Sequence, residues 1–152
     1  MWRLIAGLFL ALAAFASRRA GATGPEPPAS DGRLAPEVVL RVLEFRPIVE
    51  RETDGLRSVD VPLVLAVIAR ETGGRARQGQ DGEQGLMQVG KAAFDDYVQE
   101  TGATLSWPGD MVDPVLNIRV GSWFLNERIQ DMRASDAPRY HGLRAYNCGT
   151  SG

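Results

Sequence analysis

Apolar residues in this chain recur at helical spacing, in segments whose first residues favour a helix start. Asp60 and Pro62 open one of these segments, because the carboxylate is suited to cap a helix and the proline lies in the first turn, where no amide hydrogen is needed. We expect this helix to reach Thr72 and to stop at Gly73-Gly74. No segment alternates apolar and polar residues as a strand would. The sequence therefore predicts a mainly α domain with at most a short β-hairpin.

Similar signals predict the other elements. Asp113-Pro114 opens a long helix with apolar residues on one face. The stretch from Gly79 to Gly85 is rich in glycine and polar residues, which is typical of a loop or a small hairpin. The remaining expected helices span residues 36–46, 91–99 and 141–146.

The composition excludes several classes of function. The 152 residues leave room for one domain, and 17 basic against 19 acidic residues, a net charge of −2, offer no broad positive surface to a nucleic acid. The single cysteine, Cys148, rules out an intramolecular disulfide framework and a cysteine-based zinc site, and the single histidine, His141, rules out a multi-histidine metal site. Carboxylate chemistry without a metal or a cofactor is the main catalytic option that remains.

The amino-terminal segment is predicted to direct export. An apolar run from Leu4 to Ala16 follows Arg3, and this run is shorter than the roughly 20 residues of a membrane-spanning helix but suits the central part of a signal peptide. A cleavage site is expected after Ala22. Two arginines after the run weigh against export. Two alternatives therefore stay open: an inner-membrane anchor formed by residues 4–16, with the domain facing the periplasm, and a buried helix.

These features divide the chain into three parts. Residues 1–22 are a predicted signal peptide or signal anchor, residues 23–35 a linker rich in proline, glycine and alanine, and residues 36–152 the folded domain. The protein is expected to be periplasmic or secreted.

Glu71 is a carboxylate on an apolar helix face. Val64, Val67 and Ile68 lie seven, four and three positions before it, so it continues the stripe that should pack into the core. It also lies in the last turn, where the helix dipole disfavours negative charge, and both effects would raise the pKa of its carboxyl group. A carboxyl group that keeps its proton near neutral pH is suited to general acid catalysis. The alternative is a side chain that bends past the following glycines into water.

Three further motifs follow this glutamate along the chain. They are Gly85-Leu86-Met87-Gln88, the segment Asp113 to Gly121 (DPVLNIRVG), and Ala145-Tyr146-Asn147-Cys148-Gly149. Together with Glu71-Thr72-Gly73, these motifs resemble in order and spacing those of the catalytic domain of soluble lytic transglycosylases. That domain has a goose-type lysozyme-like fold. The resemblance covers residues 59–149, about three fifths of the chain.

The resemblance implies a lysozyme-like helical domain and a role for each matching residue. Glu71 would be the sole catalytic acid and base, acting on the bond between N-acetylmuramic acid and N-acetylglucosamine in peptidoglycan. Met87 and Gln88 would line the glycan groove, and Gln88 would form hydrogen bonds with the sugars. Tyr146 would lie against the Glu71 carboxyl group and help to orient it, and Asn147 would contact acetamido groups or brace the site.

The chain departs from the family pattern at several positions. Gly74 stands where the family usually has a bulky residue, and Cys148 replaces an alanine. Thr72 replaces a serine but keeps the hydroxyl group that would support Glu71. The sequence ends at Gly152, three residues after the last motif, so the groove is expected to be open on that side or to be completed by a partner.

Two alternative functions remain at this stage. A hydrolase (muramidase) on the same fold would need a second carboxylate about 6.5–9.5 Å from the first, and Asp81 and Glu83 are the nearby candidates in sequence. A non-catalytic module would bind glycan or support assembly without cutting. The expected partners are peptidoglycan strands, with components of an envelope-spanning assembly as a further candidate. Cell-wall remodelling, machine assembly and phage-related entry or release all fit the sequence.

Overall fold

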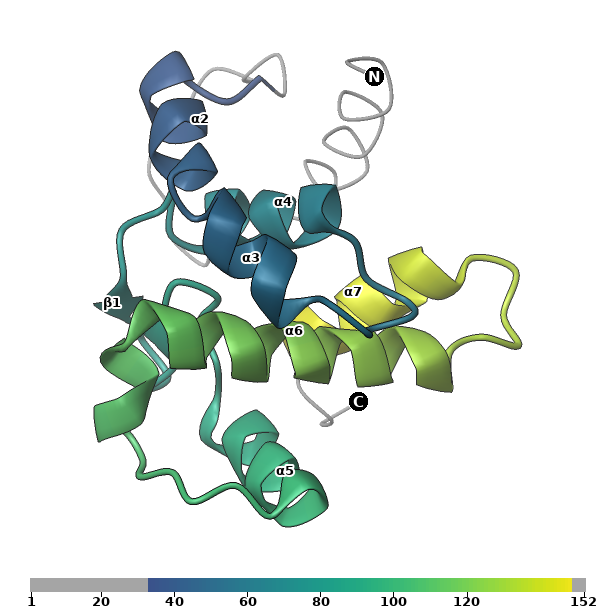
Figure 1. The fold of residues 1–152 in the computed structure, drawn as a ribbon. Coiled ribbons are helices and arrows are strands. Elements are labelled where there is room, and N and C mark those ends of the chain that lie inside the picture. The colour runs from purple at the N-terminus through teal and green to yellow at the C-terminus, as the bar shows by residue number, and fades with distance from the viewer. Residues whose placement is uncertain (1–32, 149–152) are drawn as a thin grey trace, which may run out of the picture.

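The computed structural model describes residues 33–148, which form a mainly α domain with a short hairpin (Figure 1). The elements are α2 (Pro36–Leu43), α3 (Arg46–Glu52), α4 (Val61–Glu71), β1 (Arg77–Gln78), β2 (Gln84–Gly85), α5 (Lys91–Thr101), the 3-10 helix η2 (Gly109–Val112), α6 (Pro114–Asp131) and α7 (Pro138–Cys148). Strands β1 and β2 pair antiparallel. The predicted mainly α fold with a short hairpin is therefore confirmed.

Several sequence predictions concern residues outside the described range 33–148. The predicted signal peptide or anchor (1–22) and most of the predicted linker (23–35) lie outside the described residues, as do residues 149–152. Within residues 33–148, no helix has both the length and the apolar character needed to cross a membrane. The division into three parts stays a prediction.

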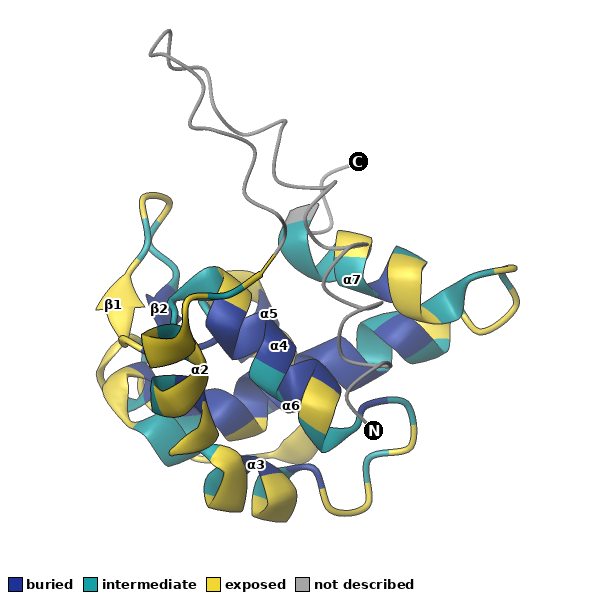
Figure 2. Cartoon of the chain, turned by 90° about the horizontal axis from the view of Figure 1, so that it is seen from above, coloured by how far each residue is buried: buried dark blue, intermediate teal, exposed yellow. Residues whose placement is uncertain are grey.

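The core of the domain is built around α4 and α6. Helix α4 packs against α2 and α3, whereas α6 packs against α3, α5 and α7. Figure 2 shows buried residues concentrated on these central helices, while α2 and α3 carry exposed outer faces. The fully buried side chains of the two central helices include Leu63, Val64, Ile68, Ile118, Val120 and Leu125.

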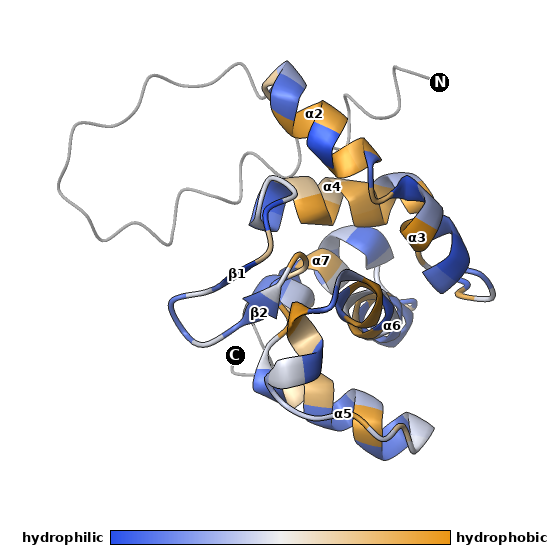
Figure 3. Cartoon of the chain, turned by 60° about the vertical axis from the view of Figure 1, so that its left-hand side comes forward, coloured by the Kyte–Doolittle hydropathy of each residue, from blue (hydrophilic) through white to orange (hydrophobic). Residues whose placement is uncertain are grey.

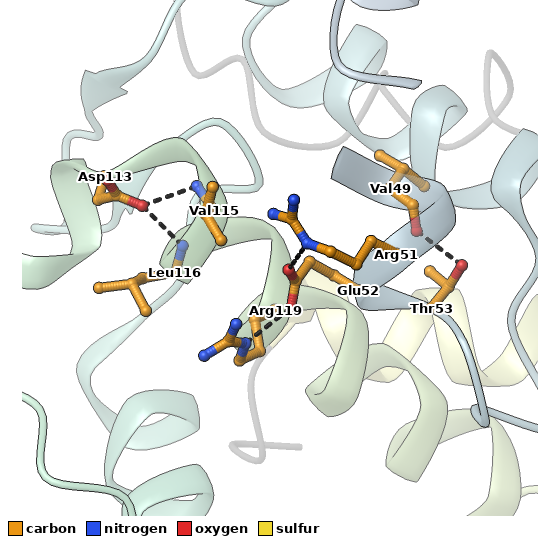
Figure 4. A network of polar contacts seen from close by, with 8 residues as sticks. All are labelled: Val49, Arg51, Glu52, Thr53, Asp113, Val115, Leu116 and Arg119. Atoms are coloured by element: carbon orange, nitrogen blue, oxygen red, sulfur yellow. Dashed lines mark hydrogen bonds and ion pairs between the residues drawn. The ribbon is translucent and has the colours of Figure 1, made fainter. Parts of the chain in front are cut away.

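The two aspartate-proline helix starts form as predicted. Asp60 Oδ1 accepts a hydrogen bond from the amide of Leu63 at 3.0 Å at the start of α4. Asp113 Oδ1 accepts from the amides of Val115 at 2.8 Å and Leu116 at 2.9 Å at the start of α6 (Figure 4). Each carboxylate satisfies first-turn amides that have no partner inside the helix.

The helix predicted over residues 36–46 ends at Leu43, and a second helix that was not predicted follows it. Helix α2 ends at Leu43, and α3 begins at Arg46 with Pro47 in its first turn. Proline has no amide hydrogen and restricts the backbone before it, so a continuous helix is interrupted there. The last helix begins at Pro138, before the predicted start at His141, because proline is also suited to a first turn.

Polar contacts join α3 to α6 (Figure 4). Glu52 accepts hydrogen bonds from Arg119 Nε at 2.7 Å and from Arg51 Nε at 2.8 Å, and its side chain is only 6% exposed. Burial alone would raise the pKa of the Glu52 carboxyl group, but the hydrogen bonds and charges of the two arginines outweigh burial and lower it. The ionised carboxylate therefore connects α3 to the central helix.

Candidate active site

Glu71 is the last residue of α4, and the chain turns directly after it. Thr72 is the C-cap, and Gly73 and Gly74 follow with φ angles of +60° and +77°, in the left-handed region that favours glycine. The helix ends at Glu71, one residue before the predicted end at Thr72, and the predicted glycine pair follows it. Glu71 is partly exposed, whereas Ile68, one turn before it, is fully buried. The carboxylate thus lies at the border between the apolar core and the surface.

Tyr146 of α7 is an electrostatic neighbour of Glu71, although the two residues are far apart in sequence. Burial raises the pKa of the Tyr146 phenol well above its ordinary value, and the negative charge of Glu71 raises it further. The Tyr146 hydroxyl donates a hydrogen bond to the carbonyl oxygen of Met87 at 2.8 Å, and its ring packs against Phe124 with the centroids 5.7 Å apart. The phenol is therefore neutral, and Met87 and Phe124 hold it in place within electrostatic range of Glu71.

Thr72 connects the end of α4 to the segment between β2 and α5. Its hydroxyl lies 2.9 Å from the carbonyl oxygen of Leu86 and 3.2 Å from that of Ile68, so the single hydroxyl hydrogen is shared between the two acceptors. The sequence predicts a hydroxyl that supports the Glu71 side chain. These contacts show that Thr72 fixes the backbone next to Glu71 against Leu86, and its support of the Glu71 side chain stays a prediction.

Asn117 is a site residue that the sequence analysis did not assign. Its Oδ1 accepts from the amide of Met87 at 2.9 Å, and its Nδ2 donates to the carbonyl oxygens of Gln84 at 2.8 Å and Met111 at 3.1 Å. The residue is completely buried on α6. The sequence contains a signal for this role, because Asn117 is a polar residue on an otherwise apolar helix face. A buried amide group needs hydrogen-bond partners.

Met87 lies in the core and not on a groove surface. It is 0% exposed, and its sulfur lies 3.8 Å from the hydroxyl oxygen of Ser122. It packs so closely on Gly121 that a Cβ there would approach the Met87 sulfur to 2.7 Å. The prediction that this side chain lines a glycan groove is therefore corrected, because no part of it is accessible to a ligand.

Gln88 turns back over the hairpin. Its backbone has a φ angle of +50°, and its Nε2 donates to the carbonyl oxygens of Arg77 at 2.9 Å and Gly85 at 2.8 Å. Both amide hydrogens are thus used within the chain. Only the side-chain oxygen of Gln88 would be left to bind a ligand. The predicted contact of Gln88 with sugars stays a prediction.

A small cavity lies between Gln88 and Tyr146. It has a volume of about 20 Å³, and Gly121 and Phe124 of α6 and Ala93 of α5 also line it. A space of this size holds about one water molecule and no sugar ring. The cavity is therefore part of the packing behind Gln88 and not a complete substrate site.

The remaining predicted residues lie on α7 and in the hairpin loop. Asn147 follows Tyr146 on α7 and is partly buried. Asp81 and Glu83 lie in the hairpin loop, where Glu83 Oε2 accepts from the amide of Asp81 at 3.1 Å. Within residues 33–148, no group of three or more histidine, cysteine, aspartate or glutamate residues is arranged to hold a metal ion.

Glu71 at the edge of the core, the partly buried Tyr146 and the segment after the hairpin all lie within a region that matches a known protein family. Residues 50–152 match the family model of the transglycosylase SLT domain, which is more than half of the chain. The chain belongs to the SLT transglycosylase family, and its helical domain is lysozyme-like. A search of curated proteins found no match. Members of the family act on peptidoglycan, which lies outside the cytoplasm.

Proposed function

We propose that this chain is a peptidoglycan lytic transglycosylase with Glu71 as its single catalytic acid and base. The enzyme cleaves the β-1,4 bond between N-acetylmuramic acid and N-acetylglucosamine and leaves 1,6-anhydro ends. The observation that carries the proposal is the position of Glu71 at the end of α4, on the edge of the apolar core, with the partly buried Tyr146 within electrostatic range. A carboxyl group at an apolar border beside a fixed polar group is suited to acid and base catalysis.

In the first step, protonated Glu71 donates to the glycosidic oxygen. The bond to the leaving sugar breaks, and positive charge develops at the anomeric carbon of the muramic acid. The acetamido carbonyl oxygen of the substrate stabilises this charge, so a second enzyme carboxylate is not required. The position of Glu71 at the edge of the apolar core supports this step, because the proposed acid must keep its proton until the bond breaks.

In the second step, ionised Glu71 takes the proton from the C6 hydroxyl of the same muramic acid. The C6 oxygen attacks the anomeric carbon and closes the anhydro ring, so no water is consumed and neither a metal nor a cofactor takes part. Tyr146 orients the carboxyl group in this proposal, because its own hydroxyl is held by Met87 and its ring is fixed against Phe124.

Gln88 and Asn147 are the proposed sugar-binding residues. Amide side chains match the donors and acceptors of acetamido and hydroxyl groups. For Gln88, the side-chain oxygen would accept from the sugar, because its two hydrogens are bound to Arg77 and Gly85. Met87 and Thr72 would support the groove from inside, through the backbone segment that they help to hold.

We place the catalytic domain at residues 36–152, behind the linker 23–35 and the signal peptide or anchor 1–22. The protein would then act in the periplasm or after secretion, or from the inner membrane if residues 4–16 are retained. Peptidoglycan strands are the proposed substrate, and an assembly that spans the envelope is a further candidate partner.

The products released from purified sacculi by residues 23–152 test the proposal. Mass spectrometry should detect muropeptides with 1,6-anhydro ends, and Glu71→Gln should abolish their release. Glu100→Gln is a matched control, because Glu100 also lies in the last turn of a helix but is exposed on α5. Reducing ends instead of anhydro ends would establish a hydrolase, with Asp81 or Glu83 as candidates for the second carboxylate. Binding of sacculi without any release would establish a non-catalytic module.

A further inference from the structure

Helix α2 covers the turn that follows Glu71. It precedes residues 50–152, the part of the chain that matches the family model, yet it packs against α4 (Figure 3). A Cβ built on Gly73 or Gly74 would meet Val38, Arg41 and Val42 of α2. The end of the helix that carries Glu71 is therefore enclosed by an element outside the matched domain.

Gly74 has no side chain to fill the space around it, and α2 fills this space. A Cβ built on Gly74 would lie 3.2 Å from Arg41 Cγ and 3.3 Å from Val42 Cγ2, which is closer than ordinary contact. Gly74 is buried as a result. The apolar stem of Arg41 thus packs directly on a glycine that is three positions after Glu71 in sequence.

The guanidinium of Arg41 also binds the same turn. Arg41 Nη1 donates to the carbonyl oxygen of Gly73 at 2.5 Å. From the hairpin side, Arg77 Nη2 donates to the carbonyl oxygen of Glu71 at 2.9 Å. Carbonyl groups at a helix end lack partners within the helix, and a cation there also interacts favourably with the helix dipole. Two arginines from different elements therefore hold the end of α4.

We propose that Arg41 is a positioning residue for Glu71, an inference that rests on the function proposed above. Gly73 and Gly74 give the turn more backbone freedom than other residues would, so a contact from outside the turn is needed to fix it. Without the Arg41 guanidinium, the last turn of α4 loosens, and the Glu71 carboxyl group loses its place beside Tyr146. Helix α2 is in this way part of the catalytic unit.

Kinetic measurements on soluble glycan strands test the proposal with the complete chain. Arg41→Met keeps the apolar stem over Gly74 but removes the hydrogen bond, and it should lower kcat by about tenfold or more with KM within about twofold, since small displacements of a catalytic group have large effects on rate. Arg41→Lys keeps a cationic donor and should recover part of kcat. Arg46→Met is the matched control, because Arg46 forms an exposed ion pair with Glu50, and it should leave kcat unchanged.

Hydrogen exchange of the amides at residues 72–75 provides a measurement that does not depend on activity. Arg41→Met should accelerate exchange at this turn, and Arg46→Met should not. The proposal is overturned if Arg41→Met leaves exchange unchanged, if it keeps kcat within about twofold, or if it raises KM alone. A loss of activity in Glu71→Gln combined with full activity in Arg41→Met would reject this inference and leave the proposed function standing. An inactive wild-type chain would reject the proposed function, and the exchange experiment would still decide whether Arg41 fixes the turn.

Discussion

Asn117 on α6 binds the amide of Met87 through its Oδ1 at 2.9 Å. Its Nδ2 donates to the carbonyl oxygen of Gln84 in β2 at 2.8 Å, so one buried side chain of the central helix holds β2 and the turn after it. Thr72 and Tyr146 hold carbonyl groups of the same turn from α4 and α7. The segment that leads to the proposed sugar-binding residue is therefore fixed by three helices.

Asn117→Ala should strongly reduce stability. The substitution leaves the buried amide of Met87 without a partner and removes one of the two hydrogen bonds that the carbonyl oxygen of Gln84 accepts, so we expect the free energy of unfolding to fall by about 3 kcal/mol. Urea unfolding followed by circular dichroism measures the change. Gln80→Ala in the exposed hairpin loop is the control, with an expected change below about 0.5 kcal/mol. A loss below about 1 kcal/mol in Asn117→Ala would contradict the proposed clamp.

Tyr146→Phe should fold but act slowly. It retains the ring packing against Phe124 and removes the hydroxyl that donates to Met87, so we expect stability to fall by about 1 kcal/mol. The initial rate on peptidoglycan should fall by about tenfold or more, because the group beside Glu71 is no longer anchored. Tyr140→Phe, at an exposed position of the same helix, should retain the wild-type rate. Equal rates in the two variants would show that the Tyr146 hydroxyl does not orient Glu71.

Gly85→Ala should be much more damaging than Gly82→Ala. Both glycines have positive φ angles, of +75° and +89°, so each substitution introduces backbone strain of about 1–3 kcal/mol. A Cβ at Gly85 would additionally overlap Asn117 Nδ2 and the carbonyl oxygen of Met111, whereas nothing lies within 4 Å of a Cβ at Gly82. Thermal unfolding of both variants gives the comparison. Similar melting temperatures would mean that the contact between Gly85 and Asn117 is not tight in solution.

The ion pairs of Glu52 predict a pH dependence of stability. The pKa of this carboxyl group is lower in the folded protein than its ordinary value of 4.5, so ionisation favours the folded state. The contribution is complete above the ordinary pKa and is lost as the pH falls through the lowered value. Denaturant unfolding between about pH 7 and pH 3 should therefore show a wild-type advantage over Glu52→Gln that shrinks in the acidic part of this range. An advantage that stays constant with pH would contradict the shift.

Local chemistry accounts for the parts of the fold that the sequence predicts correctly. Asp60 and Asp113 cap helices through amides only two or three residues away, and the glycine pair after Glu71 ends α4 through its own backbone conformation. Such signals act within one turn of chain, so they can be recognised without knowledge of the rest of the molecule. The sequence also carries a local signal for the break between α2 and α3, because Pro47 lies in the first turn of α3.

The sequence by itself determined that the domain is helical, where its aspartate-capped helices start, and that Glu71 ends an apolar helix face. Tertiary structure alone decided that Met87 is buried, that Asn117 holds the turn after β2 and that Arg41 covers the turn after Glu71. The physical reason is that a buried amide, a sulfur or a guanidinium can satisfy its contacts with many different partners. Which partner such a group binds is decided only when helices that are distant in the chain pack together.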